Sequence, residues 1–317
     1  NPGNVYSGDE SRIGLKITSG GFTSESVGDD NSISITFVID DISDYVQVDQ
    51  NGTPTSDPMT LSKIPGNITR RNLLIEYGDE HGSKEVTYTG DFIYPEIRGF
   101  YVNNEVINQS LKEEIDALFA PENFIVETFS DYNLMNAYYN ACTEVYGTGA
   151  TALPGNPNSR PVNANESGYY VMVVLTPEAY DNSNFALSNS QGGRYDIFTI
   201  VPREVEVDWA AMAEQLEKTY SGQSNTFAVT PIWKGVDGIA ESGVTQIDKD
   251  YAENNNYTNA LGYIVEYTPE DEMNTNTEGV TNAGIYTVTV RLSNESAAHG
   301  RRDIIGNYSL VGETQNQ

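Results

Sequence analysis

Apolar and polar residues alternate with a period of two along three separate stretches of the chain. These stretches cover residues 32–40, 168–176 and 284–292. In the last of them one row of side chains starts at Tyr286 and is wholly apolar, while the other row is mostly polar. Side chains of a strand point alternately to opposite faces, so this period predicts strands with one buried face.

A second pattern, with apolar residues three or four positions apart, predicts a small number of helices. It occurs over residues 110–119 and 131–147, and more briefly within residues 208–218. Ser110 can cap the first of these helices, and Asp131 lies near the start of the second.

A Tyr-Ser/Thr-Gly sequence occurs three times. Glycine suits a turn position with positive φ, and the tyrosine can fill a core from the preceding strand. The copies run from Tyr6 to Gly8, from Tyr88 to Gly90 and from Tyr220 to Gly222.

Two further short sequences recur in a constant order with these turns. Pro65 and Pro202 each follow Ile or Val and precede an alternating run. Proline fixes φ and removes a ladder donor, which favours a break between the strands of neighbouring units. A polar residue and then an aromatic one, at Asp44, Asn184 and Asn307, predict the return strand of a hairpin with a loop of variable length.

The constant order of these sequences predicts an all-β chain built from repeated units. Residues 1–66 form a partial or divergent unit, residues 67–202 a second and residues 203–317 a third. Residues 103–165, with the first two predicted helices, are interpreted as an insertion into the second unit.

The third unit resembles the bacterial Ig-like repeats of the MBG/YDG type, which occur in tandem on large exported surface proteins. The resemblance implies tandem Ig-like β-sandwich units and an extracellular, cell-surface location, and it brings no catalytic residues. The second unit lacks the tryptophan of the pattern, and the first matches it loosely. The matching pieces are Ile200 to Pro202, Val205 to Trp209, Lys218 to Gly222, Ala283 to Val290 with Tyr286, and Asn307 to Leu310 with Tyr308.

The chain is strongly acidic, with 46 Asp and Glu against 17 Lys and Arg and a net charge of −29. Nucleic-acid binding requires clustered cations that replace counterions on phosphates, so this charge argues against DNA, RNA and anionic membrane surfaces as partners. It favours a soluble monomer, and affinity for Ca²⁺ is the alternative interpretation. No stretch approaches 18 consecutive apolar residues, so no membrane span is predicted.

Residues suited to catalysis are few. His81 and His299 both lie in polar, loop-like sequence, and Cys142 lies on the apolar face of the second predicted helix, where a buried, inert thiol is expected. Asp248 and Asp250 have the spacing of a calcium loop but lack its central Gly and its final Glu, so they are a weak Ca²⁺ candidate. We therefore expect no enzyme and no cofactor, with Ca²⁺ as the one possible ion.

The insertion at residues 103–165 is the most function-like region. Tyrosine beside short polar side chains makes good contact surface, and binding residues tend to lie on loops of a rigid scaffold. The candidates are Tyr132, Tyr138, Tyr139 and Tyr146. The alternative is that these rings form a small satellite core for the helices.

The expected function is a stalk or adhesin module of a bacterial cell-surface protein, which acts in cell adhesion or ligand presentation. Two alternatives stay open: a module that binds a host glycan or matrix protein, and an accessory region of a secreted glycan-degrading enzyme.

Overall fold

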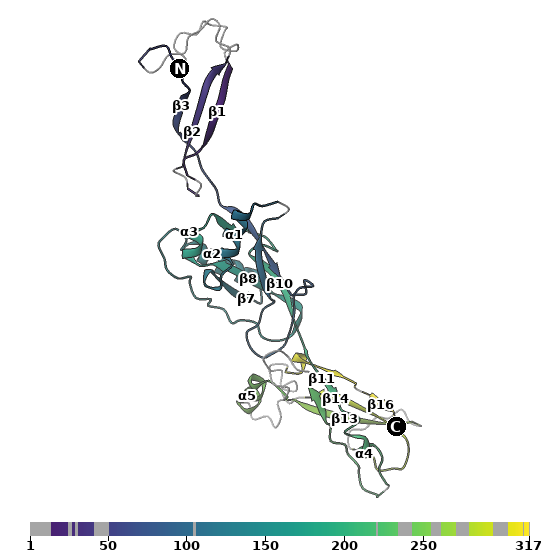
Figure 1. Cartoon of the computed structure of the whole chain (residues 1–317). Helices are drawn as coiled ribbons and strands as arrows, with labels where there is room; N and C mark the ends of the chain where they lie inside the picture. The colour runs from purple at the N-terminus through teal and green to yellow at the C-terminus, as the bar shows by residue number, and fades with distance from the viewer. Residues whose placement is uncertain are drawn as a thin grey trace. The chain divides into compact units, whose positions relative to one another are not determined.

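Strands predominate in the computed structural model, and the helices are few and short (Figure 1). This composition agrees with the predicted all-β class at the coarse level. None of the described helices has the length and apolar character needed to cross a bilayer. The structure describes residues 14–24, 27–28, 31–40, 51–103, 106–219, 221–233, 243–254, 261–270, 279–293, 304–312 and 314–316.

The chain divides into two compact units. Unit 1 consists of residues 1–73 and 178–186, and unit 2 of residues 74–177 and 187–317. The boundary predicted after residue 202 therefore lies inside unit 2, and the one predicted after residue 66 lies seven residues before residue 73.

Unit 1 contains an antiparallel sheet in the order β1-β2-β3. β2 is the predicted strand over residues 32–40. Among the side chains described in this sheet, none is buried. Its strands are β1 (Gly14–Phe22), β2 (Ser32–Asp40) and β3 (Met59–Pro65).

The largest sheet lies in unit 2 and has the order β5-β10-β8-β7. β10 pairs in parallel with β5, whereas β8 pairs antiparallel with both β10 and β7. β8 contains the second predicted strand, and its residues 171–175 are all buried. The strands are β5 (Glu85–Thr87), β7 (Phe124–Phe129), β8 (Asn165–Leu175) and β10 (Tyr195–Val201).

One face of this sheet is covered by α2 (Tyr132–Thr143), whose start and buried face were correctly predicted. Asp131 caps the helix by accepting hydrogen bonds from the backbone N–H groups of Asn133 and Leu134. The buried side chains of α2 pack against the β7 and β8 side chains in one cluster, made of Met135, Tyr138, Cys142, Phe129, Met172 and Val174.

Other helical predictions were partly wrong. α1 (Gln109–Leu118) is capped by Asn108, whose side chain accepts from the Leu111 N–H, and not by Ser110. Of residues 208–218 only α4 (Ala213–Leu216) is helical. The elements that were not predicted include β7, α3 (Pro177–Asn182) and α5 (Gln246–Asn254).

After Pro202 the chain forms two more sheets, in the orders β12-β11-β15 and β13-β14-β16. β14 is the third predicted strand, and its buried Val288 and Val290 show the expected alternation. The strands are β11 (Arg203–Val207), β12 (Pro231–Trp233), β13 (Gly262–Pro269), β14 (Tyr286–Ser293), β15 (Tyr308–Val311) and β16 (Thr314–Asn316).

The predicted hairpins are wrong, because the return strands do not pair with the long strands. β15 pairs in parallel with β11, the strand that follows Pro202. β9 (Phe185–Leu187), the return strand after β8, likewise lies beside β4 (Arg71–Tyr77) in a sheet of order β6-β4-β9 with β6 (Ile97–Tyr101). Both return strands thus join a different sheet from their long strand, as a chain does when it buries two sheets together. The return strand predicted at Asp44 lies outside the described residues.

The described turn residues have the predicted conformation, whereas Pro65 lies within unit 1 and Pro202 within unit 2 and not between units. Gly90 and Gly222 have positive φ, and Tyr88 is fully buried. Pro202 is the single residue between β10 and β11, while Pro65 ends β3. Tyr6, Gly8 and Tyr220 lie outside the described residues.

Candidate functional site

Three of the four tyrosines proposed from sequence are used for internal packing. Tyr138 is buried and donates a hydrogen bond to the Pro154 carbonyl at 3.0 Å, and Tyr146 donates to the Leu175 carbonyl at 2.9 Å. The guanidinium of Arg194 lies 3.4 Å from the centre of the Tyr139 ring. These contacts agree with the satellite-core alternative for the three residues.

The fourth tyrosine, Tyr132, lies on the surface beside two tyrosines of the sheet. Its ring centre is 5.8 Å from that of Tyr170 and 5.7 Å from that of Tyr195, with interplanar angles of 66° and 70°. The ring centres of Tyr170 and Tyr195 are 6.4 Å apart. We refer to Tyr132, Tyr170 and Tyr195 as the tyrosine cluster.

An ion pair holds the loop after α2 against the sheet. Arg160 donates to both carboxylate oxygens of Glu127, at 2.6 Å and 2.9 Å, and Asn156 donates to the same carboxylate at 2.9 Å. The hydrogen bonds to Glu127 raise the pKa of Arg160. Because the Glu127 side chain is almost buried, this two-pronged contact fixes the Pro- and Asn-rich loop on β7.

A buried carboxylate lies elsewhere in unit 2. One oxygen of Asp248 accepts hydrogen bonds from the hydroxyls of Tyr88, Tyr308 and Thr245, at 2.7, 2.8 and 2.8 Å. Burial and the charge of Asp248 raise the pKa of Tyr308 well above its ordinary value, so its hydroxyl stays a donor. We refer to these four residues as the Asp248 network.

The network gathers residues from distant parts of the sequence. Asp248 lies in the first turn of α5, where the helix dipole favours a carboxylate. Gly90 packs against the start of α5 so closely that a Cβ there would lie 2.6 Å from Cγ2 of Ile247. The three hydroxyl contacts to one oxygen of Asp248 offset part of the cost of burying a charge in a core.

The calcium candidate has a different setting from the expected loop. Residues 246–254 form α5. Asp248 accepts hydrogen bonds from three hydroxyl groups, and Asp250 accepts one from the Gln246 side chain at 2.6 Å. Among the residues that the structure describes, no group of three His, Cys, Asp or Glu side chains could hold a metal ion. Ca²⁺ binding by Asp248 and Asp250 therefore stays a prediction, although these residues lie in a helix and not in the calcium loop that the spacing suggested.

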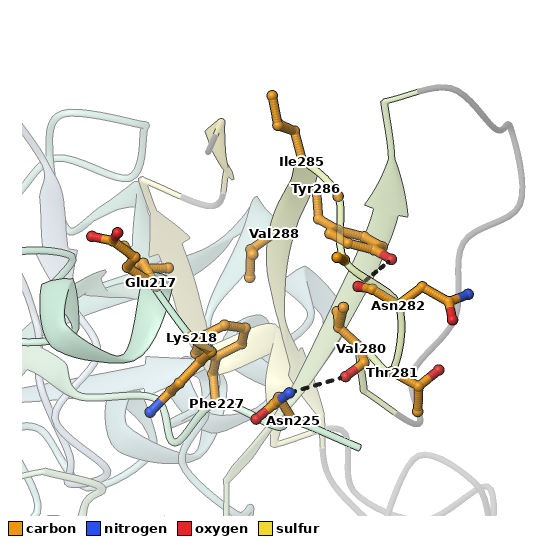
Figure 2. A pocket seen from close by; sticks show the side chains of 13 residues that line it. Glu217, Lys218, Asn225, Phe227, Val280, Thr281, Asn282, Ile285, Tyr286 and Val288 are labelled. Atoms are coloured by element: carbon orange, nitrogen blue, oxygen red, sulfur yellow. Dashed lines mark hydrogen bonds between the residues drawn. The ribbon is translucent and has the colours of Figure 1, made fainter. Parts of the chain in front are cut away.

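A pocket of about 340 Å³ opens beside β14 (Figure 2). Val280, Val288 and Phe227 give it an apolar lining, and Glu217 and Lys218 stand at one side. Its shape depends on a backbone pairing, in which Asn225 and Val280 exchange two N–H to carbonyl bonds of 2.9 Å. The pocket suits one apolar side chain or a small ligand. It lies outside residues 103–165, where specificity was expected.

The reactive side chains singled out from sequence occupy unreactive settings. Cys142 is buried, and burial raises the pKa of its thiol to about 11. His81 is exposed in a turn beside Glu80. His299 lies outside the described residues.

Sequence reasoning identified Tyr132 but missed Tyr170 and Tyr195, and it identified Asp248 but missed Thr245. Tyr170 and Tyr195 lie in strands with an alternating pattern, so the sequence could place them on strands. It could not show that both lie beside Tyr132 of α2. Comparison of the chain with protein-family models, curated proteins and solved structures gives no match.

Proposed function

We propose that the chain is a non-catalytic segment of a bacterial cell-surface protein, built from tandem Ig-like β-sandwich units, that carries tension in a stalk or adhesin. The observation that supports this proposal is the parallel pairing of β11 with β15 in unit 2.

Parallel pairing of these two strands places their hydrogen bonds in shear under tension. β11 follows directly after Pro202 and β15 lies close to the end of the unit, with Arg203 opposite Tyr308 and Glu206 opposite Val311. A pull on the chain before β11 and after β15 drags the strands in opposite directions along their length. All the hydrogen bonds of the pair then resist together, whereas bonds pulled from one end break in turn.

Side chains reinforce the beginning of the pair. Arg203 is fully buried and donates to the Gly243 carbonyl at 2.9 Å, and its register partner Tyr308 belongs to the Asp248 network. The Trp233 ring of β12 lies edge-on to Tyr308 at 5.7 Å. Sliding of β15 along β11 therefore requires these buried contacts to break as well.

Pulling single molecules in two directions tests the proposal. In the first, force is applied between the N-terminus and a cysteine handle in V311C. In the second, it is applied between handles in E206C and V311C, which are register partners, so the pair is peeled from one end. Because the native Cys142 is buried, the handles attach to the introduced cysteines and not to Cys142.

We expect rupture of the β11–β15 pair to need a several-fold higher force in the first direction, since forced unfolding follows the height of the unfolding barrier. The contour length released by residues 203–311 identifies the event. Equal forces in the two directions would contradict a tension-bearing role.

A further inference from the structure

The tyrosine cluster lies at the edge of the area of the large sheet that α2 covers. Tyr170 stands opposite Ile197 in the β8–β10 register, and Tyr195 stands opposite Met172. These residues share the sheet face on which α2 packs, and α2 buries Met172 completely. Tyr132 is the first residue of α2, so Tyr170 and Ile197 lie at the edge of the helix-covered area.

The aromatic rings at this edge are partly exposed to solvent. Tyr132 and Ile197 are each 40% exposed, and Tyr170 and Tyr195 are partly exposed. The steep angles between Tyr132 and its two neighbours set these rings edge to face rather than in a flat stack. Tyr170 and Tyr195 also pack against the buried cluster under α2, which supports one side of the tyrosine cluster.

The cluster also supplies hydrogen-bonding groups. Burial and the neighbouring phenol of Tyr132, with a hydrogen bond between the two side chains, raise the pKa of Tyr195. Its hydroxyl is neutral at physiological pH, as an ordinary phenol is. The nearest cation, Arg194, is buried against Tyr139 and donates to the Asn136 side chain at 3.1 Å. The Arg194 guanidinium, whose charge acts on Tyr195, is thus held by other groups, and the cluster itself offers ring faces and hydroxyls.

We propose that the tyrosine cluster binds a neutral carbohydrate, with a pyranose ring stacked on Tyr132. The C–H face of a sugar packs on an aromatic face while its hydroxyl groups exchange hydrogen bonds with phenols, and a tyrosine offers both at low entropy cost. The net charge of −29 repels uronate- and sulfate-bearing glycans. A protein partner needs about 20–30 residues a side, whereas three partly exposed rings give contact area for one or two sugar units.

A glycan array tests this proposal on the full chain. It carries neutral oligosaccharides and a matched set of uronate- and sialic acid-bearing ones, and the strongest neutral ligand is then titrated by calorimetry. We expect binding to neutral members only. Binding to anionic members alone, to proteins alone or to nothing would overturn the proposal.

Variants locate the site. Tyr132→Ala should weaken binding of the titrated oligosaccharide at least tenfold, whereas Tyr132→Phe, which keeps the stacking face, should weaken it less than threefold. The matched control is Tyr101→Ala, since Tyr101 on β6 is 43% exposed and lies outside the cluster. Circular dichroism confirms that each variant is folded. An equal loss in Tyr101→Ala, or full binding by Tyr132→Ala, would contradict the assignment.

Discussion

Strands β2 and β8 have the same kind of sequence but very different surroundings. Each lies inside an antiparallel arrangement, with β2 between β1 and β3 and β8 between β7 and β10. No described side chain of β2 is buried, while five consecutive residues of β8 are. Apolar alternation therefore makes a strand in both units, and the depth of burial depends on what covers the sheet.

One face of β8 is covered by α2, which belongs to the insertion and not to the repeated pattern. α2 packs Met135, Tyr138 and Cys142 onto that face, whereas no described side chain of the β1-β2-β3 sheet in unit 1 is buried. Unit 2 should accordingly hold most of the burial-dependent stability, and the following experiments measure that difference from its largest expected effect to its smallest.

The largest contrast is expected between two phenylalanines. Phe198 in β10 is 1% exposed, and Phe198→Ala should destabilise unit 2 by about 3–5 kcal/mol because it leaves a cavity. Phe22 in β1 is 45% exposed, and Phe22→Ala should cost at most about 1 kcal/mol. Urea denaturation measures both, with tryptophan fluorescence reporting on unit 2, where Trp209 and Trp233 lie. Similar losses in the two variants would mean that the sheets are equally buried.

A second contrast concerns hydrogen bonds. Asp248→Asn leaves the buried hydroxyls of its network poorly matched and should cost about 1–3 kcal/mol. Asp250→Asn, two positions along the exposed side of α5, should change stability by no more than about 0.5 kcal/mol. In unit 1, Thr60→Ala removes the exposed hydrogen bond to Thr36 and should be equally mild. A silent Asp248→Asn variant would show that the network contributes nothing to stability.

Alkaline pH should affect unit 2 selectively. Burial raises the pKa of Tyr77, Tyr138 and Tyr308, so the folded state keeps these phenols protonated where the unfolded chain would lose their protons. Their contribution is complete below about pH 10, the unfolded pKa, and is lost as the pH rises through the folded values. The free energy of unfolding, measured by urea denaturation with tryptophan fluorescence, should fall above pH 10 by at most about 1.4 kcal/mol per pH unit for each tyrosine. Tyr308→Phe should flatten this fall, and an unchanged slope would argue against its burial.

The smallest effect is expected from calcium. The Asp248 carboxylate already accepts three hydroxyl hydrogen bonds inside the core. Addition of Ca²⁺ or EDTA should therefore leave the melting temperature of the chain unchanged. A calcium-dependent rise that Asp250→Asn abolishes would restore the metal site proposed from sequence.

Local features of the fold were readable from sequence. The three alternating strands, the Asp131 cap and the buried face of α2 depend on residues a few positions apart, whose spacing fixes which side chains share a face. The positive φ of Gly90 follows in the same way from the turn it occupies.

The sequence did not predict which strands pair, because strand pairing is set by contacts between segments that are distant in the chain. β15 follows β14 in the chain but pairs with β11 about a hundred residues earlier. The α5 sequence is mostly polar and has too few apolar residues to stand out as a helix. The same limit applies to the candidate site. Tyr132 was visible as a helix residue, yet its meeting with Tyr170 and Tyr195 depends on how α2 lies across two strands.

The discontinuous make-up of unit 1 has a consequence for the order of events on the ribosome. Arg71 donates its N–H to the Asn184 carbonyl, the Arg70 guanidinium lies 4.1 Å from the centre of the Tyr180 ring, and Val27 donates to the Asn184 side chain. These contacts cannot form until residues 178–186 have been synthesised, which at translation rates takes roughly 5–20 s after residue 73. Unit 1 therefore cannot complete its contacts until a segment has been made that follows much of unit 2 in the chain, so the folding of unit 1 is coupled to the synthesis of unit 2.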